Sequence, residues 1–142
     1  KSEQMSYSLY VLEGFQFAAE EPGNDVIFSE YDPEFFVRIQ QLAPDTELAQ
    51  LETSQTQAYA SMGKVTKIDP QTLFLEEFRD AKLCLHVDIL KQGSPDVETS
   101  LNYVVKDVKG TLYAFFFQLP LKEASEGITP SLWAMAATLE QQ

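Results

Sequence analysis

The stretch that most constrains the fold is Thr111–Leu119, because it carries bulky apolar side chains at both odd and even positions. Its members are Tyr113, Phe115 and Phe117 on one side and Leu112 and Phe116 on the other. Successive side chains of a strand point to opposite faces of the sheet, so this segment needs apolar cover on both faces. A tight turn at residues 108–110 ("VKG") pairs it with a second strand, Glu98–Asp107. The hairpin therefore predicts two strands inside a sheet that is covered on both sides.

The first part of the chain predicts a three-stranded meander. The first strand runs from Tyr7 to Ala18 with alternating side chains, and Gly14 marks a kink or bulge in it. Residues Glu20–Asp25 combine proline, glycine and asparagine, which is typical of a turn. The next two strands are Val26–Tyr31 and Phe35–Leu42, separated by a break at an Asp-Pro pair.

The hydrophobic period becomes helical in two places. Between Asp45 and Met62, mostly apolar residues recur at spacings of three and four on one narrow stripe, and Gly63 offers a C-terminal stop. Near the end of the chain, Thr129 is predicted as the N-cap of a second helix and Pro130 as its first residue.

Between the two helices the pattern predicts further strands. Lys64–Asp69 is typical of a short edge strand, and Lys82–Lys91 is a strand by its length and branched residues. Leu73–Arg79 fits either a strand or a short helix. The order of elements predicts the α+β class, with an antiparallel sheet covered by helices on both faces (an α/β/α sandwich). No linker-like segment interrupts residues 1–142, so we predict a single domain.

Composition excludes several classes of protein. The 142 residues carry 22 acidic and 10 basic side chains, a net charge of −12, so a nucleic acid or an anionic membrane would be repelled. No apolar run approaches the roughly 20 residues that span a bilayer. The single cysteine excludes an internal disulfide. The acidic surface favours a protein partner with a basic patch, or cations.

Residues 82–90 ("KLCLHVDIL") hold the only cysteine and the only histidine of the chain, followed by an aspartate. On a strand, Cys84, His86 and Asp88 share one face. They stand about 7 Å apart at the backbone, whereas a catalytic triad needs converging contacts of about 3 Å, so we predict no catalytic residue. A metal site would need a further ligand from a neighbouring strand. The favoured interpretation is a core strand with a polar patch, where Cys84 is a small hydrophobe and His86 and Asp88 hydrogen-bond each other or a helix residue.

The aromatic residues near the C-terminus allow two interpretations. They could line a ligand pocket under the last helix, but a sandwich needs bulky residues there, so core packing is favoured. The set comprises Tyr103, Tyr113, Phe115, Phe116, Phe117 and Trp133. Trp133 lies early in the terminal helix and is expected to be partly exposed. It is the candidate contact residue for a partner, and no cofactor is predicted.

Two stretches at the ends of the chain resemble the PsbP-like family. "YSLYVLEGFQF" is similar to its opening strand, which leads into a Gly-aromatic turn, and "GTLYAFFFQLPLKEASEGITPSLWAMAATL" is similar to its closing strand, loop and helix. The family is named for an extrinsic subunit of photosystem II, its fold is shared by a Ran-binding nuclear transport factor, and bacteria carry secreted and lipid-anchored versions. The resemblance implies an α/β/α sandwich with a non-enzymatic role in assembly or binding. No catalytic residue carries over, because the fold has no shared active-site motif.

These observations predict a non-catalytic binding or assembly module outside the cytoplasm, at the cell surface or secreted. A lipoprotein domain tethered through a removed N-terminal segment is one form of this prediction. Two alternatives stay open. One is a small metal-dependent protein or enzyme that uses the face of Cys84, His86 and Asp88. The other is a cytosolic acidic chaperone or adaptor for a basic client. The sequence does not predict the partner or the oligomeric state.

Overall fold

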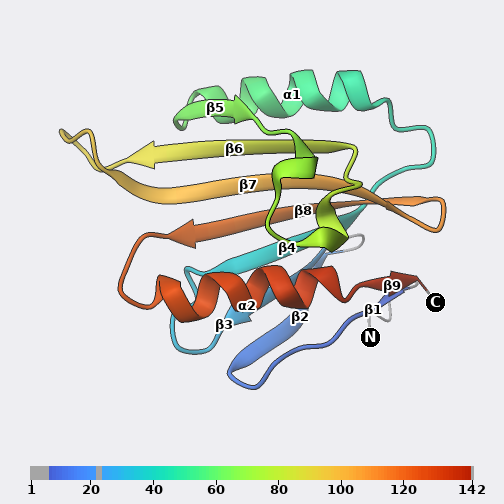
Figure 1. Cartoon of the computed structure of the whole chain (residues 1–142), viewed down its shortest axis with the longest axis horizontal. Coiled ribbons are helices and arrows are strands. Elements are labelled where there is room, and N and C mark those ends of the chain that lie inside the picture. The colour runs from blue at the N-terminus through green and yellow to red at the C-terminus, as the bar shows by residue number, and fades with distance from the viewer. Residues whose placement is uncertain (1–6, 22–23, 142) are drawn as a thin grey trace.

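The structure is a computed structural model that describes residues 7–21 and 24–141, and Figure 1 shows its arrangement. The strands are β1 (Tyr7–Ser8), β2 (Phe15–Glu21), β3 (Asn24–Ser29), β4 (Phe36–Gln41), β5 (Lys64–Lys67), β6 (Leu83–Leu90), β7 (Val97–Val108), β8 (Thr111–Pro120) and β9 (Glu140–Gln141). The α-helices are α1 (Leu48–Ala60) and α2 (Ser125–Ala137), and two single turns of 3-10 helix are η1 (Pro70–Thr72) and η2 (Glu76–Phe78).

Seven strands form one antiparallel sheet in the order β2-β3-β4-β8-β7-β6-β5. A separate two-stranded sheet pairs β1 with β9, which brings the two ends of the described chain together (Figure 1). The α+β class is confirmed. The predicted three-stranded meander is β2-β3-β4, and the predicted edge strand is β5. The centre of the turn predicted between β2 and β3 lies outside the described residues.

The predicted hairpin is confirmed and supplies the middle of the sheet. Strands β7 and β8 pair along their whole length, from Thr99↔Pro120 to Val108↔Thr111. The loop between them consists of Lys109 and Gly110, which have φ angles of 52° and 89°. Two consecutive positive φ angles are the signature of a type I′ turn, whose twist matches that of the strands. Local turn chemistry therefore fixes the register of the two strands that dominate the core.

Side-chain alternation divides the core into two clusters. One contains Tyr59 of α1 with Leu83, Leu85, Val87, Leu101, Tyr103, Val105 and Ala114. The other contains Leu132 and Met135 of α2 with, among others, Cys84, Val104, Phe115 and Phe117. Neighbours on one strand, such as Leu83 and Cys84, thus belong to different clusters, as expected of strands that are apolar on both faces.

The strand predicted from Tyr7 to Ala18 is wrong in its first half. Only Tyr7 and Ser8 are in strand conformation there, and they pair with β9 rather than with the main sheet. The following backbone bonds to the end of α2, because the Tyr10 N–H donates to Thr138 Oγ1 (2.8 Å) and the Leu12 N–H donates to Met135 Sδ (3.2 Å). The alternation of side chains alone predicted a strand. In the structure, the C-terminal end of α2 supplies the hydrogen-bond acceptors for this backbone instead.

The second helix begins earlier than predicted. It starts at Ser125, so Thr129 is not its N-cap and Pro130 lies inside it. The Ser125 hydroxyl donates to the Pro120 carbonyl (2.6 Å) and accepts from the Lys122 N–H (2.9 Å), which anchors the first turn. The early turn also buries Ile128 against the core. Proline in a helix interior costs one backbone hydrogen bond, and burial of this turn offsets that cost.

The first helix is shorter than predicted, and Gly63 has a different role. The helix spans Leu48–Ala60 and its only buried residue is Tyr59. Gly63 does not take the left-handed conformation that a C-terminal glycine cap uses. Instead, a Cβ at this position would lie 2.1 Å from the backbone oxygen of Asp88. Glycine is therefore required because the chain after α1 passes directly against β6.

Candidate functional site

Cys84 is sealed in the core and separated from the two residues with which it shares a strand face. It is 1% exposed and belongs to the cluster that packs under α2. Burial raises the pKa of its thiol from 9.0 to about 11. The thiolate is the form of cysteine that acts as a nucleophile or metal ligand, so burial disfavours the reactive form of this side chain. The interpretation as a small buried hydrophobe describes Cys84 well.

His86 and Asp88 are brought together at the open end of the same face. His86 Nε2 lies 2.8 Å from Asp88 Oδ1, so the predicted hydrogen bond between these side chains is present. The other ring nitrogen, Nδ1, lies 2.8 Å from Asn102 Oδ1. Asn102 stands directly across from His86 in the pairing of β6 with β7. Local sequence gives no indication of Asn102, because the contact depends on the register of another strand.

The metal interpretation of Cys84, His86 and Asp88 required a further ligand from a neighbouring strand. Within residues 7–21 and 24–141, no three side chains of histidine, cysteine, aspartate or glutamate are placed to hold an ion together. His86 and Asp88 are half-buried and bonded to each other, while Cys84 is enclosed by apolar residues. His86, Asp88 and Asn102 are joined by hydrogen bonds into a polar patch, which we call the β6–β7 patch.

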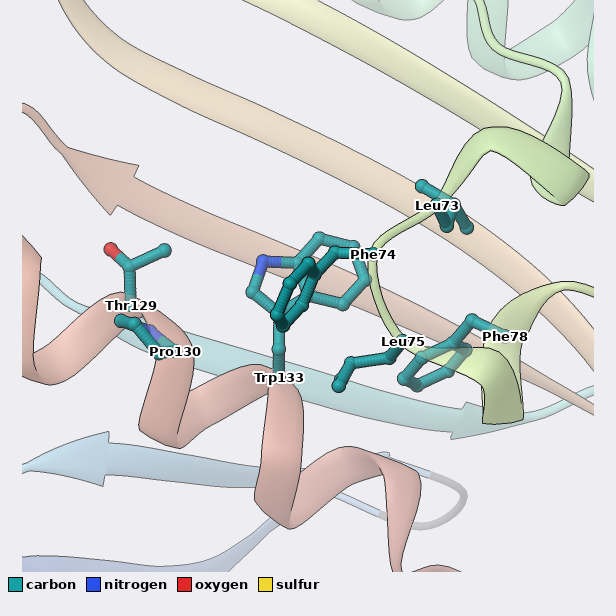
Figure 2. Close-up of a pocket in the computed structure, with 7 residues that line it drawn as sticks. All are labelled: Leu73, Phe74, Leu75, Phe78, Thr129, Pro130 and Trp133. Carbon is teal, nitrogen blue, oxygen red and sulfur yellow. The ribbon is translucent and has the colours of Figure 1, made fainter.

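An apolar pocket of ≈ 340 Å³ opens between the segment after η1 and helix α2. It is lined by Leu73, Phe74, Leu75 and Phe78 on one side and Thr129, Pro130 and Trp133 on the other. In Figure 2 these side chains converge from the loop and from the helix onto one space. We call this site the α2 pocket. Trp133, the predicted contact residue, forms part of its wall and is half-buried.

Two aromatic side chains that line the α2 pocket, Trp133 and Phe78, pack on each other and on the buried ring of Phe117. The Trp133 ring stacks on Phe117 with centroids 3.9 Å apart and an interplanar angle of 19°. Phe78 meets the edge of Trp133 at 5.5 Å and is itself 1% exposed. Aromatic contacts of this kind are worth about 0.5–1.5 kcal/mol beyond the buried area. Trp133 is thus fixed in place on one side and available to solvent on the other.

The outer wall of the pocket is held by polar contacts to its backbone. Arg79 Nε donates to the Leu73 carbonyl (3.0 Å) and its Nη2 donates to the Phe74 carbonyl (3.3 Å). Lys106 Nζ, from β7, donates to the Glu77 carbonyl of η2. Of the segment predicted as a strand or a short helix, Leu73–Arg79, residues Glu76–Phe78 form one turn of 3-10 helix and residues 73–75 are neither strand nor helix. Phe74 is 91% exposed at the tip of this wall.

Comparison of the fold with solved structures shows a PsbP-like fold. The solution structure of cyanobacterial PsbP (CyanoP) from Synechocystis has a TM-score of 0.55 at 12% identity, and the match covers 99% of this chain and 89% of that chain. A crystal structure from Bacteroides thetaiotaomicron has a TM-score of 0.56 at 12% identity and covers 99% of this chain. This chain spans 47%, about half, of the length of the Bacteroides chain. At this identity the likeness shows the fold alone, and it confirms the PsbP-like fold that the chain ends predicted.

Comparison of the sequence with known families gives a more particular result. Residues 1–140 match the family described as "Domain of unknown function (DUF8580)", and the chain belongs to this family. No curated protein matches the sequence. Among the helices that the structure describes, none is long and apolar enough to cross a membrane.

Proposed function

We propose that this chain is a non-catalytic binding or assembly module, and that its α2 pocket receives an apolar side chain from a protein partner. The observation that carries the proposal is the position of Phe74, which is 91% exposed at the mouth of a pocket that already contains Trp133. Fully burying a phenylalanine side chain is worth about 1.5–3 kcal/mol, so a partner that covers this wall gains substantial free energy.

The chemistry of the lining supports binding rather than catalysis. The seven lining residues offer one hydroxyl, on Thr129, and one indole N–H, on Trp133, but no carboxylate, amine, imidazole or thiol. General acid–base and nucleophilic catalysis both need such titratable groups within hydrogen-bond reach of a substrate. An apolar side chain, in contrast, needs only shape and apolar area. Aromatic residues of this type are the ones that dominate protein interfaces.

Electrostatics support a protein partner with a basic patch. The net charge of −12 attracts cationic surfaces over long range and repels polyanions. Close to the pocket, Glu76 and Glu77 are exposed on η2, next to the lining residues Leu75 and Phe78. A partner segment that combines an apolar anchor with basic neighbours fits both features. Two oppositely charged surfaces also associate faster, which helps a module with a small apolar site.

We also propose how the two helices are arranged on the sheet and where in the cell the module acts. Helices α1 and α2 cover opposite faces of the sheet, an α/β/α sandwich, and the division of the core into two clusters supports this. The module acts outside the cytoplasm, secreted or as a lipoprotein domain. Fractionation of cells that express the full precursor tests the location, and cytosolic recovery would leave the adaptor alternative.

Intrinsic fluorescence tests the binding site directly, because the chain has only one tryptophan and it lies in the pocket. The probe is acetyl-phenylalanine amide, a small neutral aromatic compound, titrated at 0.1–20 mM. We expect a saturable change in Trp133 emission for the wild type and a loss of at least threefold in affinity for Phe74→Ala. The matched control is Tyr31→Ala, which removes another aromatic ring that is 84% exposed but lies away from the pocket. Equal affinity in all three proteins would overturn the proposal.

A further inference from the structure

The β6–β7 patch and the α2 pocket are joined by one row of cross-strand neighbours. His86 pairs with Asn102, and Asn102 pairs with Phe117, so the three residues stand side by side on adjacent strands. Phe117 is the ring on which Trp133 stacks. Adjacent strands are about 4.8 Å apart, which places the backbone of His86 about 10 Å from the backbone of Phe117, the residue under Trp133. Phe117 itself is buried, and Trp133, which stacks on it, lines the pocket, so the β6–β7 patch and the α2 pocket lie on the same face of the sheet.

This part of the sheet is left open by the described elements. In Figure 1 the segment with η1 and η2 crosses one half of β6 and β7, and α2 lies over β3 and β4. The other half of β6 and β7, toward the C-terminal end of β6, has no helix in front of it. The side chains of His86 and Asp88 are 29% and 37% exposed, in agreement with this opening.

Asp88 presents a carboxylate that is held in place and that forms no ion pair with a lysine or arginine of residues 7–21 and 24–141. Its Oδ1 lies 2.8 Å from His86 Nε2, and the imidazole is fixed from its other side by Asn102. Its second oxygen accepts no further hydrogen bond from the described residues. Lys64 stands opposite Asp88 in the pairing of β5 with β6, yet within the described chain it forms no ion pair with Asp88. An acceptor whose orientation is already fixed loses less entropy when it binds a cation.

We infer, on the basis of the proposed function, that the partner segment carries a lysine or arginine within two residues of its apolar anchor, and that Asp88 receives this cation while the α2 pocket receives the anchor. An extended chain advances about 3.3–3.6 Å per residue, so two residues plus a lysine side chain cover the distance between the two sites. The negative charge of the module disfavours the alternative of an acidic partner segment.

Three tripeptide amides test this inference at 20 mM salt, with Trp133 fluorescence as the readout. They are acetylated phenylalanyl-glycyl-lysine, its glutamine analogue and its glutamate analogue, so only the third side chain differs. We expect the lysine peptide to bind roughly two- to fivefold more tightly than the glutamine peptide, as for a partly exposed ion pair. The glutamate peptide should bind more weakly than either. The preference for lysine should fall at 0.5 M salt, a result that needs no variant.

Two variants with the same chemical change locate the cation. Asp88→Asn should abolish the preference for lysine over glutamine. Asp45→Asn removes one exposed carboxylate near α1 and should keep the preference. An equal preference in both variants, or no preference in the wild type, would overturn the role of Asp88 and leave the pocket standing. Failure of all three peptides to bind would overturn the proposed function itself.

Discussion

The two ends of strand β6 differ although their side chains lie on the same face. At one end, Cys84 is enclosed in the core with apolar residues of β7, β8 and α2. At the other end, His86 and Asp88 are half-exposed and bond to each other and to Asn102. Alternation fixes only the direction in which a side chain points. The elements that cover each end decide whether it becomes core or a surface that can bind.

The elements that pack over each end of β6 also determine where free energy is available for binding. The sealed end is filled by rings from β8 and by Phe78 of η2, which reaches the wall of the α2 pocket but is only 1% exposed, so its apolar area is already used in folding. The open end keeps a carboxylate at its rim, and the nearby α2 pocket keeps an exposed phenylalanine, Phe74. Mutations at the sealed end should therefore change stability, and mutations at the open end should change binding.

The strongest test of this difference is Phe78→Ala. Phe78 is 1% exposed and contacts the rings of Phe115, Phe117 and Trp133. Removing a buried phenylalanine side chain costs about 3–5 kcal/mol because it leaves a cavity. We expect a loss of this size in the free energy of unfolding, measured by chemical denaturation. A loss below about 1 kcal/mol would show that η2 does not seal this end.

A second test uses alkaline pH at the sealed end. Burial raises the pKa of Cys84 from 9.0 to about 11, so between these values the folded state binds more protons than the unfolded state. The contribution is fully present below pH 9 and is lost as pH rises to about 11, by at most about 3 kcal/mol. Burial also raises the pKa of Tyr103 to about 12, which adds a loss at higher pH.

The matched comparison for this pH test is Cys84→Ala. The difference in unfolding free energy between the wild type and this variant should shrink from pH 9 to pH 11. Only the wild type loses the stabilisation that comes from the raised pKa of the buried Cys84 thiol. A difference that stays constant over this range would mean that the thiol reaches solvent in the folded state.

At the open end, His86→Ala should have a smaller effect on stability. The side chains of His86 and Asp88 are 29% and 37% exposed, and ion pairs or hydrogen bonds in such positions contribute about 0–1 kcal/mol. We expect the unfolding free energy at pH 7 to fall by no more than about 1 kcal/mol. A loss above 2 kcal/mol would place this patch in the core and remove the contrast between the two ends.

The smallest change in stability is expected for Phe74→Ala. Because Phe74 is 91% exposed, its removal should shift the unfolding free energy by less than about 0.5 kcal/mol. The same variant is expected to lose peptide binding, so stability and binding separate at this residue. Thermal denaturation beside the fluorescence titration measures both. A stability loss comparable to that of Phe78→Ala would show that Phe74 is a packing residue.

Local patterns predicted the parts of the fold that local chemistry determines. The β7–β8 hairpin followed from a Lys-Gly turn between apolar strands, and β6 followed from its branched residues. The errors occur where distant groups replace local partners. Residues after Ser8 bond to the end of α2 instead of continuing a strand, and Pro130 is tolerated because the earlier turn of its helix is buried.

The same distinction holds for the candidate sites. The spacing of two residues on a strand placed Cys84, His86 and Asp88 on one face. It could not show that only His86 and Asp88 contact each other, or that Asn102 completes the patch. The pocket wall at Leu73–Leu75 was not predicted, since its backbone is held by Arg79 and η2 is held by Lys106 from another strand. Trp133 was selected from its position in the terminal helix, although that helix begins five residues earlier than expected.

The most direct measurement is a map of backbone amide shifts in ¹⁵N-labelled protein during titration with acetylated phenylalanyl-glycyl-lysine amide. The binding surface proposed for this protein predicts that the largest shifts fall at residues 73–75, 129 and 131–133, together with the side-chain indole N–H of Trp133. A second group should fall at residues 86–88 and 102. The amides around Cys84 and along the outer side of α1 should stay unchanged. Shifts concentrated on α1, or a saturable titration without any shift at residues 73–75 and 129–133, would contradict it.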